Sequence, residues 1–150
     1  MQPMSDETKR RQIESIYQKV RQSFPDVPET TVEEFQNLKD KDEVVVVDVR
    51  SAGEQAVSMI PGAVTSREFE EHQEDYKGFT VLAHCTVGGR SGLYAKDLQA
   101  RGWKVFNLKG AILAWTHAGG PLVDPEGPTR RVHVHSSRFN LVADGYDAVW

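Results

Sequence analysis

The sequence contains one cysteine, Cys85, in 150 residues. A single thiol excludes an intramolecular disulfide and any metal site built on several cysteines. Long apolar runs are also missing, since runs such as Val44–Val47 fall far short of the roughly 20 apolar residues that a membrane-spanning helix needs. The N-terminal segment has no apolar core of the kind found in secretory signal peptides. We therefore expect a cytoplasmic protein that does not enter a membrane.

An excess of positive charge is missing as well. The chain has 18 Lys and Arg against 22 Asp and Glu, which gives a net charge of −4. Proteins that bind nucleic acids neutralise phosphates with a basic patch, so nucleic acid is not an expected partner. The share of charged residues, 27%, and of apolar residues, 39%, is ordinary for a globular domain. The length fits one such domain.

Helical and strand patterns alternate along the chain. Residues 6–24 predict an amphipathic helix with one apolar stripe. Thr31 and Glu34 predict the capped start of a second helix, which ends at Leu38. After a polar turn at Lys39–Asp42, the β-branched run that follows predicts a strand buried on both faces. Further strands are expected at 79–84 and 104–108, and further helices at 66–72, 90–101 and 110–117.

This alternation predicts an α/β fold with a central, mostly parallel sheet and helices on both faces. We divide the chain into an N-terminal helical extension (1–30), a main domain (31–122) and a C-terminal extension (123–150), with residues 121–129 as a linker. The C-terminal extension is too apolar for a solvated tail. We expect it to fold back on the domain as an added strand, or to pack on a partner chain.

Cys85 lies between a predicted buried strand and a predicted helix. In open α/β sheets, ligands bind beyond the carboxyl ends of the strands, where this cysteine is placed. Gly88 and Gly89 permit a positive φ, the helix start offers unpaired N–H groups, and Arg90 adds a cation. These features favour an ionised thiolate and a bound anion above it. We therefore predict that Cys85 is a catalytic nucleophile and not an inert buried thiol.

Several motifs, taken together and in order, resemble the single-domain rhodanese family. They are the loop Cys85–Ser91, Asp48-Val49-Arg50, Pro61-Gly62-Ala63 and the segment from Gly110 to Trp115. The resemblance extends from about residue 31 to residue 122. It implies the rhodanese fold and a ping-pong reaction. In that reaction the cysteine takes a sulfane sulfur from a donor such as thiosulfate, becomes a persulfide, and passes the sulfur to cyanide or a thiol. No metal or cofactor is implied.

The resemblance also assigns roles by position. Cys85 is the nucleophile, and the residues that hold the anionic sulfur are Thr86, Val87, Gly88, Gly89, Arg90 and Ser91. Arg90 would in addition hold the charged group of the donor. Arg50 and Glu54 resemble a structural pair that braces the strand end, and Asp48 either bonds to the loop or simply ends the strand. Ser58-Met59 stands where the family has Gly-His, which leaves that turn undefined.

Two other classes of function remain. The pattern His84-Cys85 followed by Arg90 resembles the signature of cysteine-dependent phosphatases and arsenate reductases, but only four residues separate the cysteine from the arginine, one fewer than in those enzymes. A non-catalytic rhodanese-like module would be expected to lack the cysteine or the glycines. A protein acceptor or a second copy of the chain could bind through the N-terminal helix or the C-terminal tail.

Other conspicuous side chains receive structural roles. His133 and His135 alternate with valines, which is typical of a solvent-facing edge strand, and two imidazoles make an incomplete zinc site. Strand alternation turns His84 away from the cysteine, so we expect it in the core or supporting the site. Trp115 is likewise expected in the core.

Overall fold

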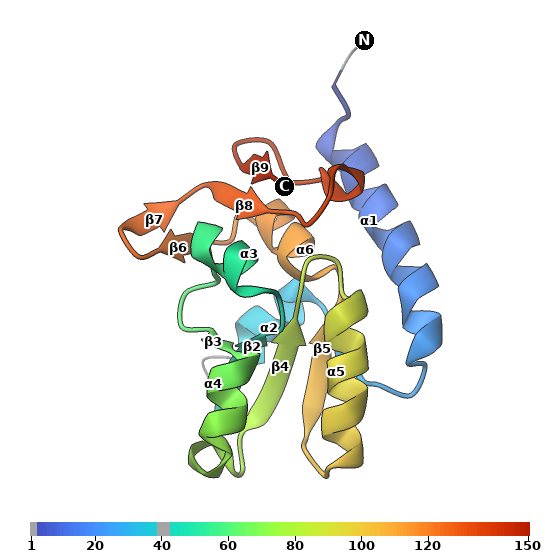
Figure 1. Cartoon of the computed structure of the whole chain (residues 1–150). Coiled ribbons are helices and arrows are strands. Elements are labelled where there is room, and N and C mark those ends of the chain that lie inside the picture. Colours follow the sequence, from blue (N-terminus) through green and yellow to red (C-terminus); the bar gives the residue numbers. More distant parts are fainter. Residues whose placement is uncertain (1–2, 39–42) are drawn as a thin grey trace.

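A five-stranded parallel sheet forms the centre of the computed structural model, which describes residues 3–38 and 43–150 (Figure 1). The turn expected at Lys39–Asp42 lies outside the described residues. The strands follow the spatial order β1 (Glu29–Thr30), β5 (Val105–Leu108), β4 (Thr80–His84), β2 (Val44–Asp48) and β3 (Val64–Thr65). The register between β2 and β4 places Asp48 beside His84 at the carboxyl edge of the sheet. The mostly parallel sheet predicted from the sequence is confirmed.

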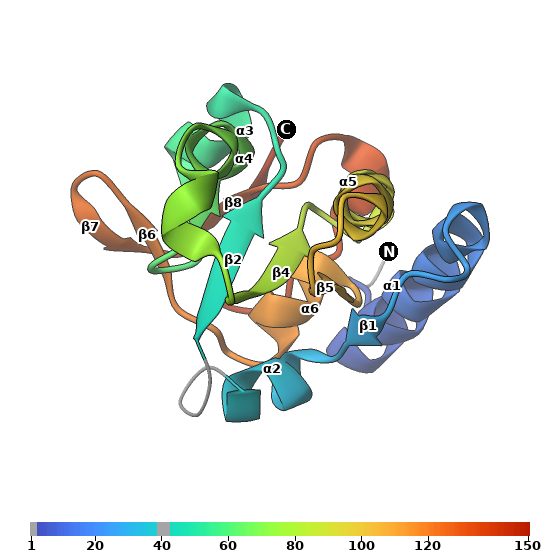
Figure 2. The ribbon, with the colours of Figure 1, turned by 90° about the horizontal axis from the view of Figure 1, so that it is seen from below.

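Helices cover both faces of this sheet, as predicted. They are α1 (Asp6–Val20), α2 (Val32–Leu38), α3 (Ala52–Val57), α4 (Ser66–Glu71), α5 (Gly89–Ala100) and α6 (Ala111–His117), with short 3-10 turns at Arg21–Ser23, Gln73–Tyr76 and Ser137–Phe139. In Figure 2, α4 and α5 lie on one side of the sheet and α2 and α6 on the other. Phe69 and Leu98 belong to the core cluster on the side of α4 and α5, and Leu108 and Ile112 belong to the cluster on the side of α2 and α6.

Capping boxes start three of the short helices. The Thr31 hydroxyl accepts a hydrogen bond from the Glu34 N–H while the Glu34 carboxylate accepts one from Thr31, as expected. The same reciprocal bonds join Ser51 to Glu54 at the start of α3, and Thr65 to Glu68 at the start of α4. We did not expect α3, although Ser51 and Glu54 stand at the spacing of a capping box.

The segment at residues 121–129 is not a linker. It forms an antiparallel hairpin of β6 (Leu122–Asp124) and β7 (Gly127–Thr129). Asp124 accepts the N–H of Glu126 in the turn, and Gly127 supplies a φ of +130° that an L side chain rarely adopts. The composition of this segment is therefore that of a tight turn.

The tail folds back onto the domain through a small sheet of its own. Its strands β8 (Arg131–His133) and β9 (Asp147–Val149) pair in parallel, and neither joins the central sheet. Val132, Val134 and Leu141 are buried in the same core cluster as Ile112 of α6. No helix among residues 3–38 and 43–150 is long and apolar enough to cross a membrane.

Candidate active site

Cys85 follows β4 directly and lies at the carboxyl edge of the sheet, where the loop turns into α5. Its residue exposure is 2%, so the thiol sits at the bottom of the loop and not on the surface. The loop is fixed from below by the start of α6. The N–H of Ile112 donates to the carbonyl of Cys85 at 3.3 Å, and the N–H of Leu113 donates to that of Thr86 at 3.2 Å. These bonds hold the carbonyls of Cys85 and Thr86 against the start of α6.

The first turn of α5 provides polar contacts to the sulfur. The backbone N–H of Ser91 donates to Cys85 Sγ at 3.4 Å, and Ser91 Oγ lies at the same distance. A backbone N–H at a helix start carries the positive end of the helix dipole, so this contact favours a negatively charged sulfur. Ser91 is fully buried, so this contact lies away from bulk water.

Asn107 on β5 orients this contact, although the sequence reasoning missed it. Its Nδ2 donates to the carbonyl of Gly88 at 2.9 Å, which fixes the amide so that Oδ1 accepts the Ser91 hydroxyl at 2.7 Å. The single hydroxyl proton therefore points to Asn107, and the N–H of Ser91 remains the donor to Cys85. A signal was present in the sequence, because Asn107 is a polar residue inside an apolar strand.

The two loop glycines adopt different conformations. Gly88 caps α5 with a φ of +124°, as expected of a residue that needs the freedom of glycine. The expectation of a positive φ at Gly89 is wrong, because Gly89 is the first residue of α5 and follows the helical backbone. Thr86 and Val87 complete the loop, and both are buried.

The expected pair between Arg50 and Glu54 is also wrong. Arg50 binds Asp48 instead, with Nη2 2.7 Å from Oδ2 and Nε 3.0 Å from Oδ1, and it donates to the carbonyl of Ser58 at 2.8 Å. The Asp48 carboxylate also accepts the backbone N–H of Arg50 at 3.0 Å, so the turn that follows β2 brings the two side chains together. The buried Ser58 hydroxyl donates to the carbonyl of Arg131 at 2.6 Å, so this departure from the family pattern connects the tail to the site.

Arg90 is paired with Glu54 and is not a free cation. Its two terminal nitrogens lie 2.8 and 2.9 Å from the two carboxylate oxygens, and Nη2 also donates to Thr86 Oγ1 at 3.0 Å. Burial disfavours the charge on Glu54, but hydrogen bonds from Arg90 and from the Ser51 backbone lower the pKa of Glu54 to about 2. The same bond raises the pKa of Arg90. The pair therefore stays ionised.

The remaining expected structural residues lie in or near the core. His84 is fully buried beneath the loop, with Nδ1 3.1 Å from the carbonyl of Cys85 and Nε2 3.7 Å from Asp48 Oδ2. Burial lowers the pKa of His84, although the Asp48 carboxylate opposes this shift. Trp115 is buried and donates to the carbonyl of Pro121 at 2.8 Å. Among the described residues, no group of His, Cys, Asp and Glu side chains is arranged to hold a metal ion.

Comparisons with known proteins agree with this geometry. Residues 31–118, more than half of the chain, match the family model of the rhodanese-like domain. The chain is 36% identical over 99 residues to a sulfurtransferase of Allochromatium vinosum, a match that covers 61% of this chain and 90% of that protein. Among solved structures, a thiosulfate sulfurtransferase from Pseudomonas aeruginosa has a TM-score of 0.59 at 26% identity, covering 85% of this chain and 25% of the other.

A second solved structure, a protein of unknown function from Rhodopseudomonas palustris described as a possible tyrosine phosphatase, has a TM-score of 0.55 at 28% identity. That match covers 73% of this chain and 92% of the other. The family model, together with the fold and the position of the cysteine, confirms the resemblance carried by the motifs. This chain belongs to the rhodanese family.

Proposed function

We propose that the protein is a sulfurtransferase in which Cys85 carries the sulfur as a persulfide. The observation that carries this proposal is the contact between Cys85 Sγ and the first turn of α5, where the Ser91 N–H points at the sulfur. A thiolate stabilised in this way is already an activated nucleophile and needs no general base to deprotonate it. The relatives named sulfurtransferases support the same class of reaction.

In the first half-reaction, the Cys85 thiolate attacks the outer, sulfane sulfur of thiosulfate. A new S–S bond forms, the S–S bond of thiosulfate breaks, and sulfite leaves with the electron pair. In the second half-reaction, cyanide or a thiolate attacks the outer sulfur of the persulfide. The Cys85 thiolate is then the leaving group, and the product is thiocyanate or a new persulfide. Both steps are displacements that need no oxidant or metal.

The loop residues would bind the sulfur and the donor. We propose that the backbone from Thr86 to Ser91 faces the transferred sulfur. Arg90 meets an anionic donor only through the part of its guanidinium that Glu54 leaves open, since the side chain is 37% exposed. Backbone N–H groups therefore carry more of the donor's charge than the sequence alone suggested.

The acceptor is external to these 150 residues, because they contain no second thiol. A persulfide on Cys85 cannot be displaced by a neighbouring cysteine of the same sequence, which would otherwise close a disulfide. We propose a small thiol or a thiol of another protein as the acceptor. Either would have to reach a sulfur at the bottom of the loop, which favours a slim or extended group over a broad one.

A thiosulfate–cyanide assay tests the proposal. We expect the wild type to form thiocyanate and Cys85→Ser to form none above background, while Thr86→Ser, which keeps the hydroxyl bonded to Arg90, retains activity. An aryl phosphate substrate is the second arm of the assay. Release of phosphate without any sulfur transfer would favour a phosphatase, and inactivity toward both classes would favour a binding module.

A further inference from the structure

The N-terminal helix α1 lies outside the segment that matches the family model, yet it packs against the catalytic loop. Tyr17 on this helix is 1% exposed. A Cβ atom built on Gly88 would lie 2.8 Å from both Cδ1 and Cε1 of the Tyr17 ring. The ring is therefore in close contact with the backbone of Gly88, at the one loop residue whose positive φ shapes the turn into α5.

The same contact surface continues along α5. A Cβ atom on Gly89 would lie 3.6 Å from Val20, and one on Gly92 would lie 2.0 Å from the ring of Phe24. Gly92 has an ordinary helical φ, so its missing side chain serves close packing and not backbone freedom. The start of α5 therefore packs closely against Tyr17, Val20 and Phe24, because the three facing positions are glycines.

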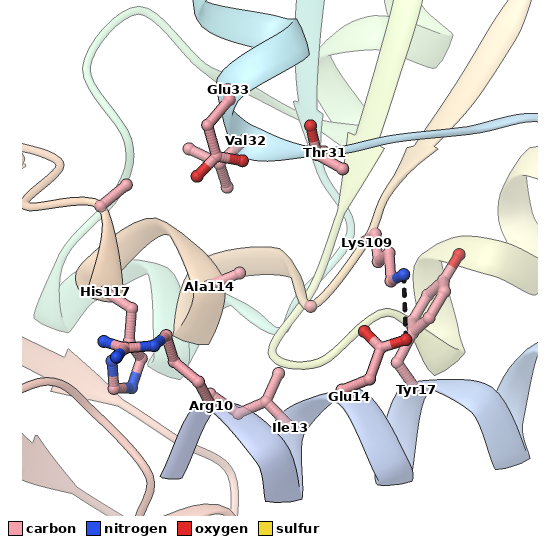
Figure 3. Close-up of a pocket in the computed structure, with 12 residues that line it drawn as sticks. Arg10, Ile13, Glu14, Tyr17, Thr31, Val32, Glu33, Lys109, Ala114 and His117 are labelled. Carbon is pink, nitrogen blue, oxygen red and sulfur yellow. Dashed lines mark ion pairs between the residues drawn. The ribbon is translucent and has the colours of Figure 1, made fainter. Parts of the chain in front are cut away.

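The other end of α1 is held by the tail. Lys9 Nζ donates to the carbonyl of Val142 at 3.0 Å, and the Asp6 carboxylate accepts the N–H of Asp144 at 3.1 Å. Between this attachment and Tyr17, α1 lines a cavity of about 260 Å³ together with residues of α2 and α6, while Ile13 packs into the same core cluster as Ile112. Figure 3 shows Arg10 and His117 at one end of the cavity and Tyr17 at the other, beside the Glu14–Lys109 ion pair. Tyr17 thus lies at one end of the cavity and also contacts Gly88 of the Cys85 loop.

We propose that Tyr17 is a positioning residue for Cys85, an inference that rests on the proposed sulfur transfer. Its ring packs against Gly88, whose carbonyl is held by Asn107. Ser91, three residues further, then keeps its N–H directed at the sulfur. Without the ring, Gly88 is free to move into the space that it leaves, and the contact between Ser91 and Cys85 lengthens.

The contact between Tyr17 and Gly88 is made by the ring and not by the hydroxyl, which faces Glu29 and Asn107. Burial, reinforced by the neighbouring Glu29, raises the pKa of Tyr17, so the group stays protonated throughout the working pH range. The ring alone makes the contact with Gly88. Tyr17→Phe keeps the ring and Tyr17→Ala removes it, so the two variants separate packing from hydroxyl chemistry.

The experiment measures two properties of the full chain in Tyr17→Ala, Tyr17→Leu and Tyr17→Phe. The first is the rate of Cys85 alkylation by iodoacetamide as a function of pH, and the second is kcat and KM in the thiosulfate–cyanide assay. Leu98→Ala is the matched control, because Leu98 is fully buried in the last turn of α5, away from the loop. It reports the effect of lost core packing alone.

For Tyr17→Ala we expect the alkylation profile to move to higher pH and kcat to fall roughly 10- to 100-fold, as is usual when a reacting group is misplaced. Tyr17→Leu should show a smaller change in the same direction, and it replaces Tyr17→Ala if that variant does not fold. Tyr17→Phe should show a smaller change than Tyr17→Leu, because it keeps the ring against Gly88. Leu98→Ala should lose stability but keep the wild-type profile and kcat.

A wild-type alkylation profile and kcat in folded Tyr17→Ala or Tyr17→Leu would overturn the proposal. An equal loss in Tyr17→Phe would also overturn it, because the hydroxyl would then matter more than the ring. If no variant and not even the wild type transfers sulfur, the proposed function fails. In that case a shifted alkylation profile in Tyr17→Ala still supports the positioning role, so the two failures are distinguishable.

Discussion

Two arginine–carboxylate pairs lie near the carboxyl edge of the sheet, and they differ in their access to water. The side chains of Arg50 and Asp48 are both 0% exposed, whereas those of Arg90 and Glu54 are 37% and 5% exposed. Arg50 also donates to the carbonyl of Ser58, so its bonds connect the end of β2 to the end of α3. Arg90 connects α3 to the Cys85 loop through Glu54 and Thr86.

The difference shows how one kind of pair serves two purposes. Removing one partner from a fully buried pair leaves an uncompensated charge away from water, so the first pair determines whether this edge of the sheet holds together. A pair that is open to water on one side is screened and costs less to break. The second pair is therefore suited to limit the positive charge beside Cys85 without controlling the fold.

The largest expected effect comes from breaking the buried pair. Arg50→Met should lower the free energy of unfolding by about 3–5 kcal/mol, because Asp48 is left ionised and unpaired in the interior. Urea unfolding measures this loss. Arg67→Met is the matched control, since Arg67 pairs with Glu71 on the surface and its loss should cost less than about 1 kcal/mol. A loss below that limit in Arg50→Met would mean that the buried pair is not structural.

A smaller effect is expected from breaking the open pair. Glu54→Gln should lower the free energy of unfolding by about 1–2 kcal/mol, because a hydrogen-bonded charge is lost where water can partly replace it. It also leaves the charge of Arg90 uncompensated beside the sulfur. We therefore expect the KM for thiosulfate to fall about two- to fivefold at low salt.

Glu70→Gln is the control for this kinetic effect. Glu70 makes the same two-pronged contact with Arg101, at 3.0 and 3.1 Å, but on the surface between α4 and the end of α5. Its KM for thiosulfate should equal that of the wild type. If Glu54→Gln raises the KM instead, Glu54 would orient Arg90 for the donor and would not restrain its charge.

The smallest expected effect is a change in how the stability depends on pH, which tests the pair of Glu54 and Arg90. The pKa of Glu54 is lowered from the ordinary 4.5 to about 2, so the folded state binds its proton less readily than the unfolded state. Its stabilising contribution is therefore complete above pH 4.5 and is lost as the pH falls toward 2. We expect the melting temperatures of the wild type and Glu54→Gln to differ at pH 6 and to converge over that range. A constant difference from pH 6 to pH 3 would contradict this.

The sequence predicted the elements that have strong local signals. The β-branched run of β2 and the apolar run of β4 are visible because both are buried on two faces. In contrast, β1 spans only Glu29–Thr30 and is a strand because it pairs with β5. No local sequence pattern predicts so short an element. The hairpin at β6 and β7 was mistaken for a linker because turns and linkers share Pro and Gly.

The place of Cys85 and its loop at the carboxyl edge of the sheet was also predictable, because Cys85 stands alone between a strand and a Gly-Gly-Arg sequence. The partners of the arginines were not. Both carboxylates are visible in the sequence, but the pairing depends on α3, whose capping box turns Glu54 toward the loop. Asn107 and Tyr17 come from β5 and α1, far from the loop in sequence, and only the folded chain brings them to Gly88.

Intact mass after incubation with thiosulfate tests most directly whether Cys85 carries the transferred sulfur. We predict that the wild type gains the mass of one sulfur atom, that cyanide removes it with formation of thiocyanate, and that Cys85→Ser gains nothing. An unchanged mass in a wild-type chain whose thiol still reacts with iodoacetamide would contradict the transfer of sulfur from thiosulfate through a persulfide on Cys85.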